Sequence, residues 1–381
     1  MVGGGPDAFI GAVHRMAARL DGRFTLAAGA FSSDPSRSRT AGEGLGVPSD
    51  RRYEHYQEMA DREAQRPDGI RVVSIVTPNH LHAPVAKAFL QRDIHVVCDK
   101  PMTTTVADAE DLCRLAATRG LLFAVTYNYS GYPMVKEARA RVLGGALGEV
   151  RKVIVEYSQG WLRTLLEAEG HKQAEWRSDP ERAGASSALG DIGSHAHHLV
   201  RYVTGLEVRR LFADLGTVVQ GRRMEDDATV LLELDGGARG VLLASQVATG
   251  ERNHLRLRVY GAEASLDWCQ EEPNRLRLLA PDGTETILHR GGDLAEATVR
   301  GTRLPAGHPE GFIEAFANVY GAVADALEAG SVGSGAASGA DLPPPELPDV
   351  RDGAQGVHFI HQALESDRAQ RWIDAEYVPP R

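Results

Sequence analysis

The sequence predicts an α/β protein of two parts, a doubly wound domain with a parallel sheet followed by an α+β domain built on an open, largely antiparallel sheet. Short apolar strands alternate with helices in the first third of the chain, which is typical of parallel sheets. Longer alternating strands follow one another through short turns beyond residue 150, which favours antiparallel pairing. The length of 381 residues also exceeds what one compact core usually organises.

The first part begins with a helix, because apolar residues recur at helical spacing over 9–20 and Asp21-Gly22 ends the pattern. The β-branched run over 72–76 is typical of a strand buried on both faces of a parallel sheet. The other elements predicted here are strands over 24–31, 94–98 and 121–125 and helices over 84–90 and 106–119.

The elements predicted in the second part are a helix over 135–143 and strands over 153–157, 228–234, 240–246, 255–260 and 276–279. A stretch rich in Gly, Ser, Ala and Pro follows and predicts a flexible connection. A last amphipathic helix is predicted over 350–366. The predicted domains are therefore 1–129, 130–328, a linker at 329–348 and a C-terminal helix and tail over 349–381.

The composition argues against several classes of protein. The chain has 42 Lys+Arg against 52 Asp+Glu, a net charge of −10, with no long basic run, so we expect no nucleic-acid partner and no anionic membrane surface. No apolar stretch approaches the roughly 20 residues of a membrane span, and the first residues do not form a signal peptide. The three cysteines lie far apart, which favours a reducing compartment. We therefore expect a cytoplasmic protein.

Glycines open the chain just before the first predicted helix. The run Gly3-Gly4-Gly5-Pro6-Asp7-Ala8 matches G-x-G-x-x-A, the relaxed fingerprint of a Rossmann dinucleotide-binding domain, in which the helix N-terminus faces the pyrophosphate. A strand should precede this fingerprint, so we expect either a nearly absent first strand or a natural reading frame that starts upstream. The residues expected to bind the cofactor here are Gly3, Gly5, Ala8, Phe9 and Ile10.

The turn after the second predicted strand bears on the choice between NAD and NADP. An NAD enzyme usually places a carboxylate there, on the adenosine ribose. The segment 31–37 has no acid at that point, and Ser32, Ser33 and Arg37 suit a 2′-phosphate. We therefore favour NADP over NAD, although an ordinary polar turn before a helix that starts at Pro35 explains the same residues.

Three further motifs follow in order on matching elements. They are Thr77-Pro78-Asn79-His80-Leu81-His82 after the strand over 72–76, Asp99-Lys100-Pro101 after the next strand, and Gly190-Asp191-Ile192-Gly193-Ser194-His195 in the second part. Together they resemble the Gfo/Idh/MocA family, the enzymes similar to glucose–fructose oxidoreductase and inositol dehydrogenase. The resemblance covers nearly the whole chain, from Gly3 to the last helix, excluding the linker.

The resemblance implies that Thr77, Pro78, Asn79 and His82 border the nicotinamide, where the carboxyl ends of parallel strands meet. Helix capping and surface polarity are the alternative for Asn79 and His82. The resemblance also implies that Lys100 is catalytic, reaching the reacting hydroxyl or carbonyl of the substrate. A lysine can help proton transfer there if its pKa is lowered by its surroundings.

Asp99 departs from that pattern, and the third motif adds the candidates Asp191 and His195. Asp99 stands where the family usually has glutamate and is expected near the cofactor, with its partner left open. Asp191 and His195 are four residues apart and would share one face of a helix. The resemblance implies that His195 is an acid/base or substrate contact and that Asp191 binds substrate or orients the histidine.

Other candidates carry less chemistry. His197 and His198 suggest a metal, but no Cys or carboxylate cluster completes a tetrahedral set, so we expect no metal site. Large aromatics in such positions also serve as core packing. The remaining candidates are Asn128, Trp176 and Arg177 for the cofactor and Tyr129 and Trp161 for the substrate, with Lys100, Asp191 and His195 also contacting substrate.

The resemblance implies an enzyme that transfers hydride between NAD(P) and a secondary hydroxyl or carbonyl of a sugar, cyclitol or glycoside. One alternative holds NAD tightly and uses it transiently for sugar elimination or glycoside cleavage. Another is a regulator that binds the dinucleotide without catalysis. We also expect the open sheet to mediate a homodimer or homotetramer.

Overall fold

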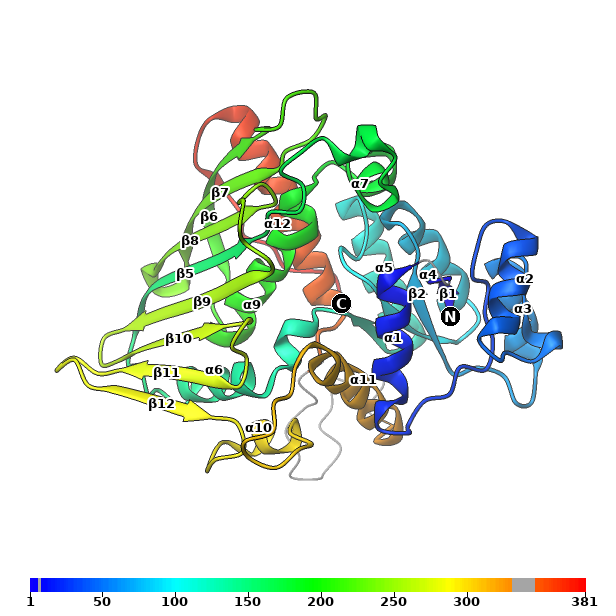
Figure 1. The fold of residues 1–381 in the computed structure, drawn as a ribbon, viewed down its shortest axis with the longest axis horizontal. Coiled ribbons are helices and arrows are strands. Elements are labelled where there is room, and N and C mark those ends of the chain that lie inside the picture. The colour runs from blue at the N-terminus through cyan, green and yellow to red at the C-terminus, as the bar shows by residue number, and fades with distance from the viewer. Residues whose placement is uncertain (6–7, 331–346) are drawn as a thin grey trace. The chain divides into compact units, whose positions relative to one another are not determined.

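The computed structural model describes residues 1–5, 8–330 and 347–381 (Figure 1). The chain divides into two compact units. The first consists of Met1–Tyr127, Phe316–Ala354 and Pro379–Arg381, and the second of Asn128–Ala315 and Gln355–Val378. Within the described ranges, no helix combines the length and the apolar character that crossing a membrane requires.

The first unit contains a four-stranded parallel sheet in the order β1-β2-β3-β4. Its strands are β1 (Val2–Gly3), β2 (Val72–Val76), β3 (His95–Cys98) and β4 (Phe123–Val125). Its helices include α1 (Phe9–Leu20), α2 (Pro35–Gly44), α3 (Tyr56–Gln65), α4 (His82–Leu90) and α5 (Val106–Arg119), with 3-10 turns η1 (Ser49–Arg51) and η2 (Asn79–Leu81). The predicted parallel sheet and its alternating helices are confirmed, and the helices over 9–20 and 106–119 match residue for residue.

The strand predicted over 24–31 is wrong. Only Gly29 and Ala30 form isolated bridges, Ala30 with Val2 and Gly29 with Arg52. The backbone of this segment follows β1, since Gly3 N donates to Ala30 O at 2.8 Å and Ala30 N donates to Met1 O at 3.1 Å. Because β1 is two residues long, it provides too few partners for a continuous ladder.

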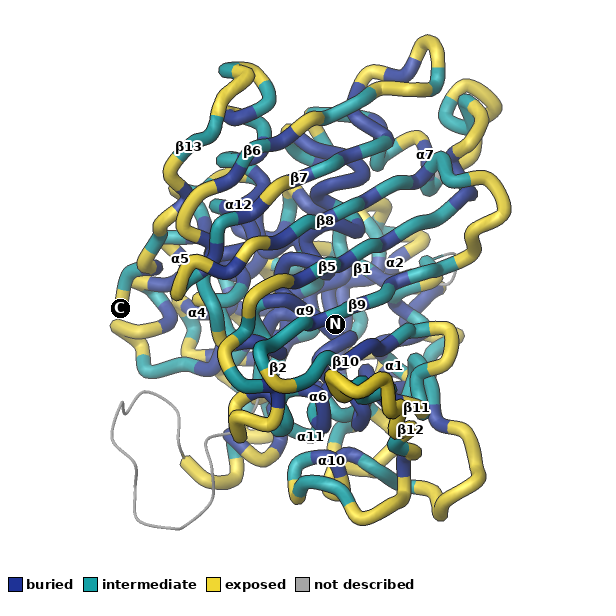
Figure 2. Tube along the Cα trace, turned by 90° about the vertical axis from the view of Figure 1, so that its left-hand side faces the viewer, coloured by how far each residue is buried: buried dark blue, intermediate teal, exposed yellow. Residues whose placement is uncertain are grey.

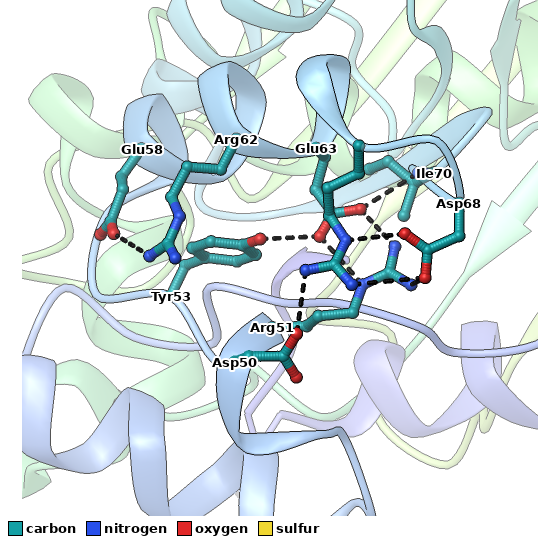
Figure 3. A network of polar contacts seen from close by, with 9 residues as sticks. Asp50, Arg51, Tyr53, Glu58, Arg62, Glu63, Asp68 and Ile70 are labelled. Carbon is teal, nitrogen blue, oxygen red and sulfur yellow. Dashed lines mark hydrogen bonds and ion pairs between the residues drawn. The ribbon is translucent and has the colours of Figure 1, made fainter.

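A buried ion pair between Arg51 and Glu63 anchors residues 51–53, the segment whose backbone bonds to Gly29 (Figure 3). Arg51 contacts both carboxylate oxygens of Glu63, which also accepts from Tyr53 Oη at 2.7 Å and Ile70 N at 3.1 Å. Burial opposes the charge of Glu63, yet the hydrogen bonds from Arg51, Tyr53 and Ile70 hold its pKa below the usual range. This network ties α3 to residues 51–53, whose backbone exchanges hydrogen bonds with Gly29.

The second unit contains a nine-stranded sheet in the order β12-β11-β10-β9-β5-β8-β7-β6-β13. Its strands are β5 (Val150–Ser158), β6 (Val208–Gly216), β7 (Asp227–Leu234), β8 (Arg239–Ser245), β9 (His254–Gly261), β10 (Ser265–Cys269), β11 (Arg275–Leu279), β12 (Glu285–His289) and β13 (Ile373–Asp374). All neighbours pair antiparallel except β5 and β8, which run parallel. The predicted open, largely antiparallel sheet is confirmed, but β6, β10, β12 and β13 were not predicted.

Helices cover one face of this sheet. Val155 and Leu257 on the strands pack with α6 (Pro133–Leu143), α9 (Ser194–Thr204) and α12 (Val350–Ala369) in one apolar core. Figure 2 looks onto the sheet, whose strands alternate between buried and half-buried positions. The shorter elements of this unit are η3 (Asn128–Gly131), η4 (Leu166–Glu169), α7 (Lys172–Arg177), α8 (Pro180–Ala183), the π-helix η5 (Leu189–Gly193), η6 (Asp235–Gly237) and α10 (Glu296–Arg300).

Two helices pass from one unit to the other. The helix α11 (Phe312–Glu328) belongs to the first unit from Phe316 onward, although the sequence placed it in the domain over 130–328. The helix α12 divides after Ala354, so the predicted C-terminal helix and tail are shared between the units. Most of the predicted linker, at 331–346, lies outside the described residues.

Candidate functional site

The glycine loop joins β1 to α1 and is shaped by close backbone contacts. Gly3 and Gly4 have φ of +75° and +67°, which only glycine adopts readily. A Cβ at Gly3 would lie 2.6 Å from Val76 O, and one at Gly11 would lie 2.5 Å from Gly4 Cα. The loop therefore rests on both β2 and α1, as a dinucleotide fingerprint requires.

Gly11 provides the close packing of helix and loop that the third glycine provides in a dinucleotide fingerprint. Ala8, at that position, is the N-cap of α1 and adds no capping side chain. The first turn of α1 carries no acidic side chain, so its N–H groups remain suited to a phosphate. Gly4 and Gly11 were missed, although a glycine in the first turn of an amphipathic helix is a recognisable signal.

Two neighbours on α1 hold the loop and the helix in place. Arg15 Nη1 donates to Gly4 O at 2.6 Å. His14 Nδ1 is 2.7 Å from Tyr320 Oη, which lies 2.8 Å from Ser74 Oγ on β2. Burial lowers the pKa of His14 to about 4, so the imidazole is neutral at pH 7. Neither residue was among the predicted candidates.

The turn considered for the adenosine end is organised around α2. Asp34 Oδ1 accepts from Arg37 N at 2.8 Å and caps α2, and Ser32 Oγ accepts from Asp34 N at 3.1 Å. The side chains of Ser33 and Arg37 are exposed. Because Asp34 is used as a helix cap, the turn presents hydroxyl and guanidinium groups rather than an uncommitted carboxylate.

The motifs after β2 and β3 are joined by a buried histidine. His82 lies at the start of α4, and its Nδ1 is 2.8 Å from Pro101 O while its Nε2 is 2.9 Å from Thr77 O. Burial lowers its pKa. Both ring nitrogens thus face backbone carbonyls of the two loops and hold these loops together, while contact of His82 with the cofactor stays a prediction.

The same loops carry Lys100, the candidate catalytic residue of the first unit. Asp99 Oδ1 accepts from Lys100 N at 3.0 Å and from Thr126 Oγ1 at 2.8 Å, and the Lys100–Pro101 peptide is cis. The carboxylate of Asp99 thereby connects the end of β3 to the residue after β4. Asn79 is nearly buried in η2 at the end of β2. Lys100 and Asn79 therefore follow adjacent strands at the carboxyl edge of the sheet, where ligands bind in such folds.

Asp191 and His195 are carried by two different helical forms. His195 lies in the first turn of α9, whereas Asp191 lies in the π-helix η5, so the helix on which their spacing was considered is a π-turn followed by an α-helix. Glu225 Oε1 fixes the approach to η5 by accepting from Ser186 Oγ at 2.6 Å, Ser187 N at 2.7 Å and Leu189 N at 3.2 Å. Single π-turns within helices are frequent at functional sites.

Asp191 is held by two polar side chains. Gln246 Nε2 donates to Asp191 Oδ2 at 2.9 Å, and Arg177 Nε lies 3.4 Å from the same oxygen. The guanidinium of Arg177 stacks on Trp176, with 4.3 Å from Cζ to the ring centroid. The structure thus places Arg177 beside Asp191, although the sequence assigned Arg177 to the cofactor. Gln246 was missed.

A series of hydroxyl and amide groups extends from the surroundings of His195. The ring of His195 lies 4.7 Å from that of Tyr129, whose hydroxyl bonds to Tyr157 Oη. Tyr157 Oη donates to Asn253 Oδ1 at 2.8 Å, and Gln159 Nε2 donates to the same oxygen at 2.7 Å. Burial raises the pKa of Tyr129 and Tyr157, so both remain protonated donors.

Two predicted residues adjoin this series. Trp161 Nε1 donates to Gln159 Oε1 at 3.0 Å, which places Trp161 beside this series. Asn128 is buried in η3, immediately before Tyr129. Gln159 and Gln246 directly follow β5 and β8, so polar residues at adjacent strand ends were the signal that could have found them.

His197 and His198 are occupied by packing. The ring of His197 stacks on Phe359 at 4.2 Å, and that of His198 stacks on Tyr202 at 5.9 Å. Burial holds the pKa of His197 well below its usual value.

The candidate catalytic residues belong to different units. Lys100 lies in the first unit, while Asp191 and His195 lie in the second.

Comparison with known proteins identifies both parts. Residues 1–127 match the model of the oxidoreductase family with an NAD-binding Rossmann fold, and residues 135–267 match the GFO/IDH/MocA C-terminal domain. The chain is 35% identical to the uncharacterized oxidoreductase YfiI of Bacillus subtilis, over 98% of this chain and 95% of that one. It is 26% identical to levoglucosan dehydrogenase of Pseudarthrobacter phenanthrenivorans, over 81% of each. An inositol dehydrogenase homolog from Azotobacter vinelandii, solved with NAD+, has a TM-score of 0.92 and 37% identity, covering 98% of this chain and 96% of that one.

Proposed function

Because this chain belongs to the Gfo/Idh/MocA family of NAD-binding oxidoreductases, we propose that it transfers hydride between NAD(P) and a secondary hydroxyl or carbonyl of a sugar, cyclitol or glycoside. The observation that carries the substrate class is the series of hydroxyl and amide groups near His195 and Asp191. Such groups donate to and accept from a polyol in the directions that several neighbouring hydroxyls require.

The residues of the first unit fit a dinucleotide. The backbones of Gly3, Gly4 and Gly11 approach β2 and each other so closely that a Cβ would clash there, and α1 begins beside this loop with no acidic side chain in its first turn. NAD(P), when bound, supplies the hydride acceptor or donor. We assign the pyrophosphate to the Gly3–Gly5 loop and the nicotinamide to the side of Asn79 and Lys100.

In the oxidation direction, His195 takes the proton of the substrate hydroxyl while the carbon of that hydroxyl loses hydride. Lys100 donates a hydrogen bond to the same oxygen and stabilises the negative charge that develops on it. Asp191, held by Gln246 and Arg177, accepts from a neighbouring substrate hydroxyl or orients His195. In the reduction direction, His195 returns its proton to the carbonyl oxygen.

Replacing Lys100 tests this assignment. Lys100→Met keeps the length of the side chain and removes its charge and its donors, so we expect kcat to fall by about 10²- to 10⁴-fold while dinucleotide affinity stays within a few-fold. Absorbance of the reduced nicotinamide measures turnover with inositols, anhydrosugars and aldoses, and calorimetry measures cofactor binding. Unchanged turnover would remove Lys100 from the mechanism.

The same assay separates the alternative functions. Reduced nicotinamide should accumulate in proportion to the substrate consumed, whereas an enzyme that uses NAD only transiently would form product without net reduction. A regulator would bind NAD(P) without oxidising any member of the panel. Retention of Lys100, Asp191 and His195 together favours an enzyme over a regulator, because a sensor needs no proton-transfer groups.

For the cofactor, we propose that the turn at Ser32 and Ser33 accepts NADP as well as NAD. Exposed hydroxyls and Arg37 favour a 2′-phosphate, and the homolog from Azotobacter vinelandii was solved with NAD+. Ser33→Asp would add a carboxylate that repels a 2′-phosphate, so we expect kcat/KM for NADP to fall by about tenfold or more while the value for NAD holds or rises. Ser36→Asp, on the exposed side of α2, serves as the control for added charge. Equal losses for both cofactors would contradict the proposal.

A further inference from the structure

Three side chains with metal-binding atoms lie near the Nδ1 atom of His254, in the second unit. His254 begins β9, and its Nδ1 lies 3.6 Å from Glu271 Oε2, 4.0 Å from Glu251 Oε2 and 3.9 Å from Cys269 Sγ. The strands β9 and β10 pair antiparallel, which brings Cys269 at the end of β10 beside the start of β9. Ligand atoms of His254 and the two glutamates all lie within 4.8 Å of one another, and Cys269 joins this group only through its 3.9 Å separation from His254 Nδ1.

We infer that Glu251, His254, Cys269 and Glu271 form a site for a divalent cation of the zinc type. In a tetrahedral zinc site the bonds are about 2.0–2.1 Å to nitrogen and oxygen and about 2.3 Å to sulfur, which separates neighbouring ligand atoms by about 3.3–3.6 Å. The separation of His254 Nδ1 from Glu271 Oε2, 3.6 Å, falls at the end of this range, and those from Glu251 Oε2 and Cys269 Sγ, 4.0 and 3.9 Å, exceed it by a few tenths of an ångström. Rotation of partly exposed side chains closes such a gap.

The donor set selects the kind of cation. Imidazole nitrogen and thiolate sulfur suit zinc, whereas magnesium and calcium require mainly oxygen ligands. Binding forms a bond from Cys269 Sγ to the metal and releases the thiol proton to solvent, so affinity must rise with pH. No electron is transferred.

Nearby cations are engaged with other carboxylates. Arg256 donates to Asp267 at 2.6 and 2.9 Å, and Arg258 donates to Glu156 at 3.3 Å. Glu156 also lies 3.7 Å from His254 Nε2, on the side of the ring away from the proposed site. The carboxylates of Glu251 and Glu271 therefore face His254 Nδ1, where a divalent cation would balance their charge.

This site differs from the one that the sequence excluded. No metal site is expected from the sequence, an expectation drawn from His197 and His198 and from the lack of a Cys or carboxylate cluster, and the proposed site runs against it. The cysteine and the carboxylates of the proposed site lie in two short motifs, E-x-x-H starting at Glu251 and C-x-E starting at Cys269. Only the pairing of β9 with β10 brings these two motifs together. The site also adjoins the polar series, because Asn253 N donates to Glu271 Oε1 at 3.2 Å.

Titration of the full chain with zinc tests the inference. After treatment with a chelator and dialysis, calorimetry with ZnCl2 should show one equivalent bound with an affinity that rises with pH. Cobalt(II) should bind at the same site and give a thiolate charge-transfer band in the near ultraviolet. Magnesium and calcium should give no saturable binding.

Variants identify the ligands. His254→Ala and Cys269→Ser should each weaken zinc binding by about a hundredfold, because losing a residue that only hydrogen-bonds a metal ligand already weakens binding by about 10- to 100-fold. Cys269→Ser should also abolish the charge-transfer band. His289→Ala, an exposed histidine on β12, is the matched control and should bind zinc as the parent does. Circular dichroism confirms that each variant is folded, and Glu271→Gln serves if either ligand variant is not. Absence of saturable zinc binding by the parent chain, or equal binding by parent, His254→Ala and Cys269→Ser, would overturn the inference.

Discussion

At the scale of single residues, the dinucleotide loop depends on atoms that are missing from glycines. Gly4 and Gly11 belong to different elements, and their backbones approach so closely that a Cβ at Gly11 would lie 2.5–2.8 Å from three atoms of Gly4. Backbone atoms cannot move aside as the end of a side chain can. The loop and the helix therefore hold each other in the conformation that a pyrophosphate needs.

Gly11→Ala should disrupt this contact. The added methyl must displace the loop or the start of α1, so we expect a stability loss of about 1–3 kcal/mol and a dinucleotide affinity at least about tenfold weaker. Thermal unfolding and calorimetry with NAD+ measure the two effects. Gly44→Ala at the end of α2 is the control, because a Cβ there meets nothing within 4 Å. If both variants bind the cofactor as the parent chain does, the close approach does not shape the site.

At the scale of elements, the π-helix η5 separates Asp191 from the regular helix that carries His195. Its approach is anchored by Glu225, a carboxylate that accepts three hydrogen bonds from residues 186–189. Burial raises the pKa of Glu225 despite these hydrogen bonds. The carboxyl group thus contributes as an acceptor, while its charge opposes folding.

The raised pKa of Glu225 predicts a pH effect on stability. A group whose pKa is higher in the folded than in the unfolded chain stabilises the fold below its unfolded pKa, and that contribution is lost as the pH rises through the folded pKa. Glu225→Gln keeps an acceptor oxygen and cannot ionise. We therefore expect its melting temperature, relative to the parent, to increase as the pH rises from the unfolded pKa of a glutamate to the raised folded pKa of Glu225, and to stay constant above it.

Glu225→Ala provides the contrast, because it removes the acceptor at every pH. We expect it to lose about 1–3 kcal/mol of stability, the cost of leaving buried donors unpaired, and to lower kcat through the displaced Asp191. A melting difference between Glu225→Gln and the parent that is independent of pH would show that the buried charge has no such effect.

At the scale of the whole molecule, the large sheet presents one face that no helix of the described residues covers (Figure 2). Phe212, Val241 and Leu243 on that face are half-buried, and Leu231 is 39% exposed. Open apolar sheet faces of this kind favour self-association through a twofold axis. We propose that two copies of the chain associate through this face, forming a homodimer or half of a homotetramer.

Light scattering after size exclusion tests the association. The parent chain should elute as a dimer or tetramer, and Leu231→Glu should shift it toward the monomer, because a buried charge on each copy would lack a partner. Val299→Glu on α10, where Val299 is 55% exposed, is the control and should leave the assembly unchanged. A monomeric parent chain would contradict the proposal.

Local patterns alone determined the parallel sheet, the helices beside it, and the motifs that contain Lys100, Asp191 and His195. Buried β-branched runs and helical periodicity are properties of a few adjacent residues, and so can be recognised without a partner. The prediction of a strand over 24–31 was wrong for the opposite reason. A strand forms only when a neighbouring strand is long enough to pair with it, and β1 has two residues.

Only the tertiary structure decided which polar groups surround the candidate catalytic residues. Gln159, Gln246 and Asn253 become neighbours because β5, β8 and β9 are paired, although they are separated by up to 94 positions in the sequence. The π-turn at Asp191 likewise depends on Glu225, which lies far along the chain. The family, the fold class and the residues of the motifs could be predicted from the sequence, because each was recognised from residues that are adjacent in the chain. The arrangement of hydrogen-bonding groups around them depended on strand pairing, because contacts between distant segments leave no periodic signal in either one.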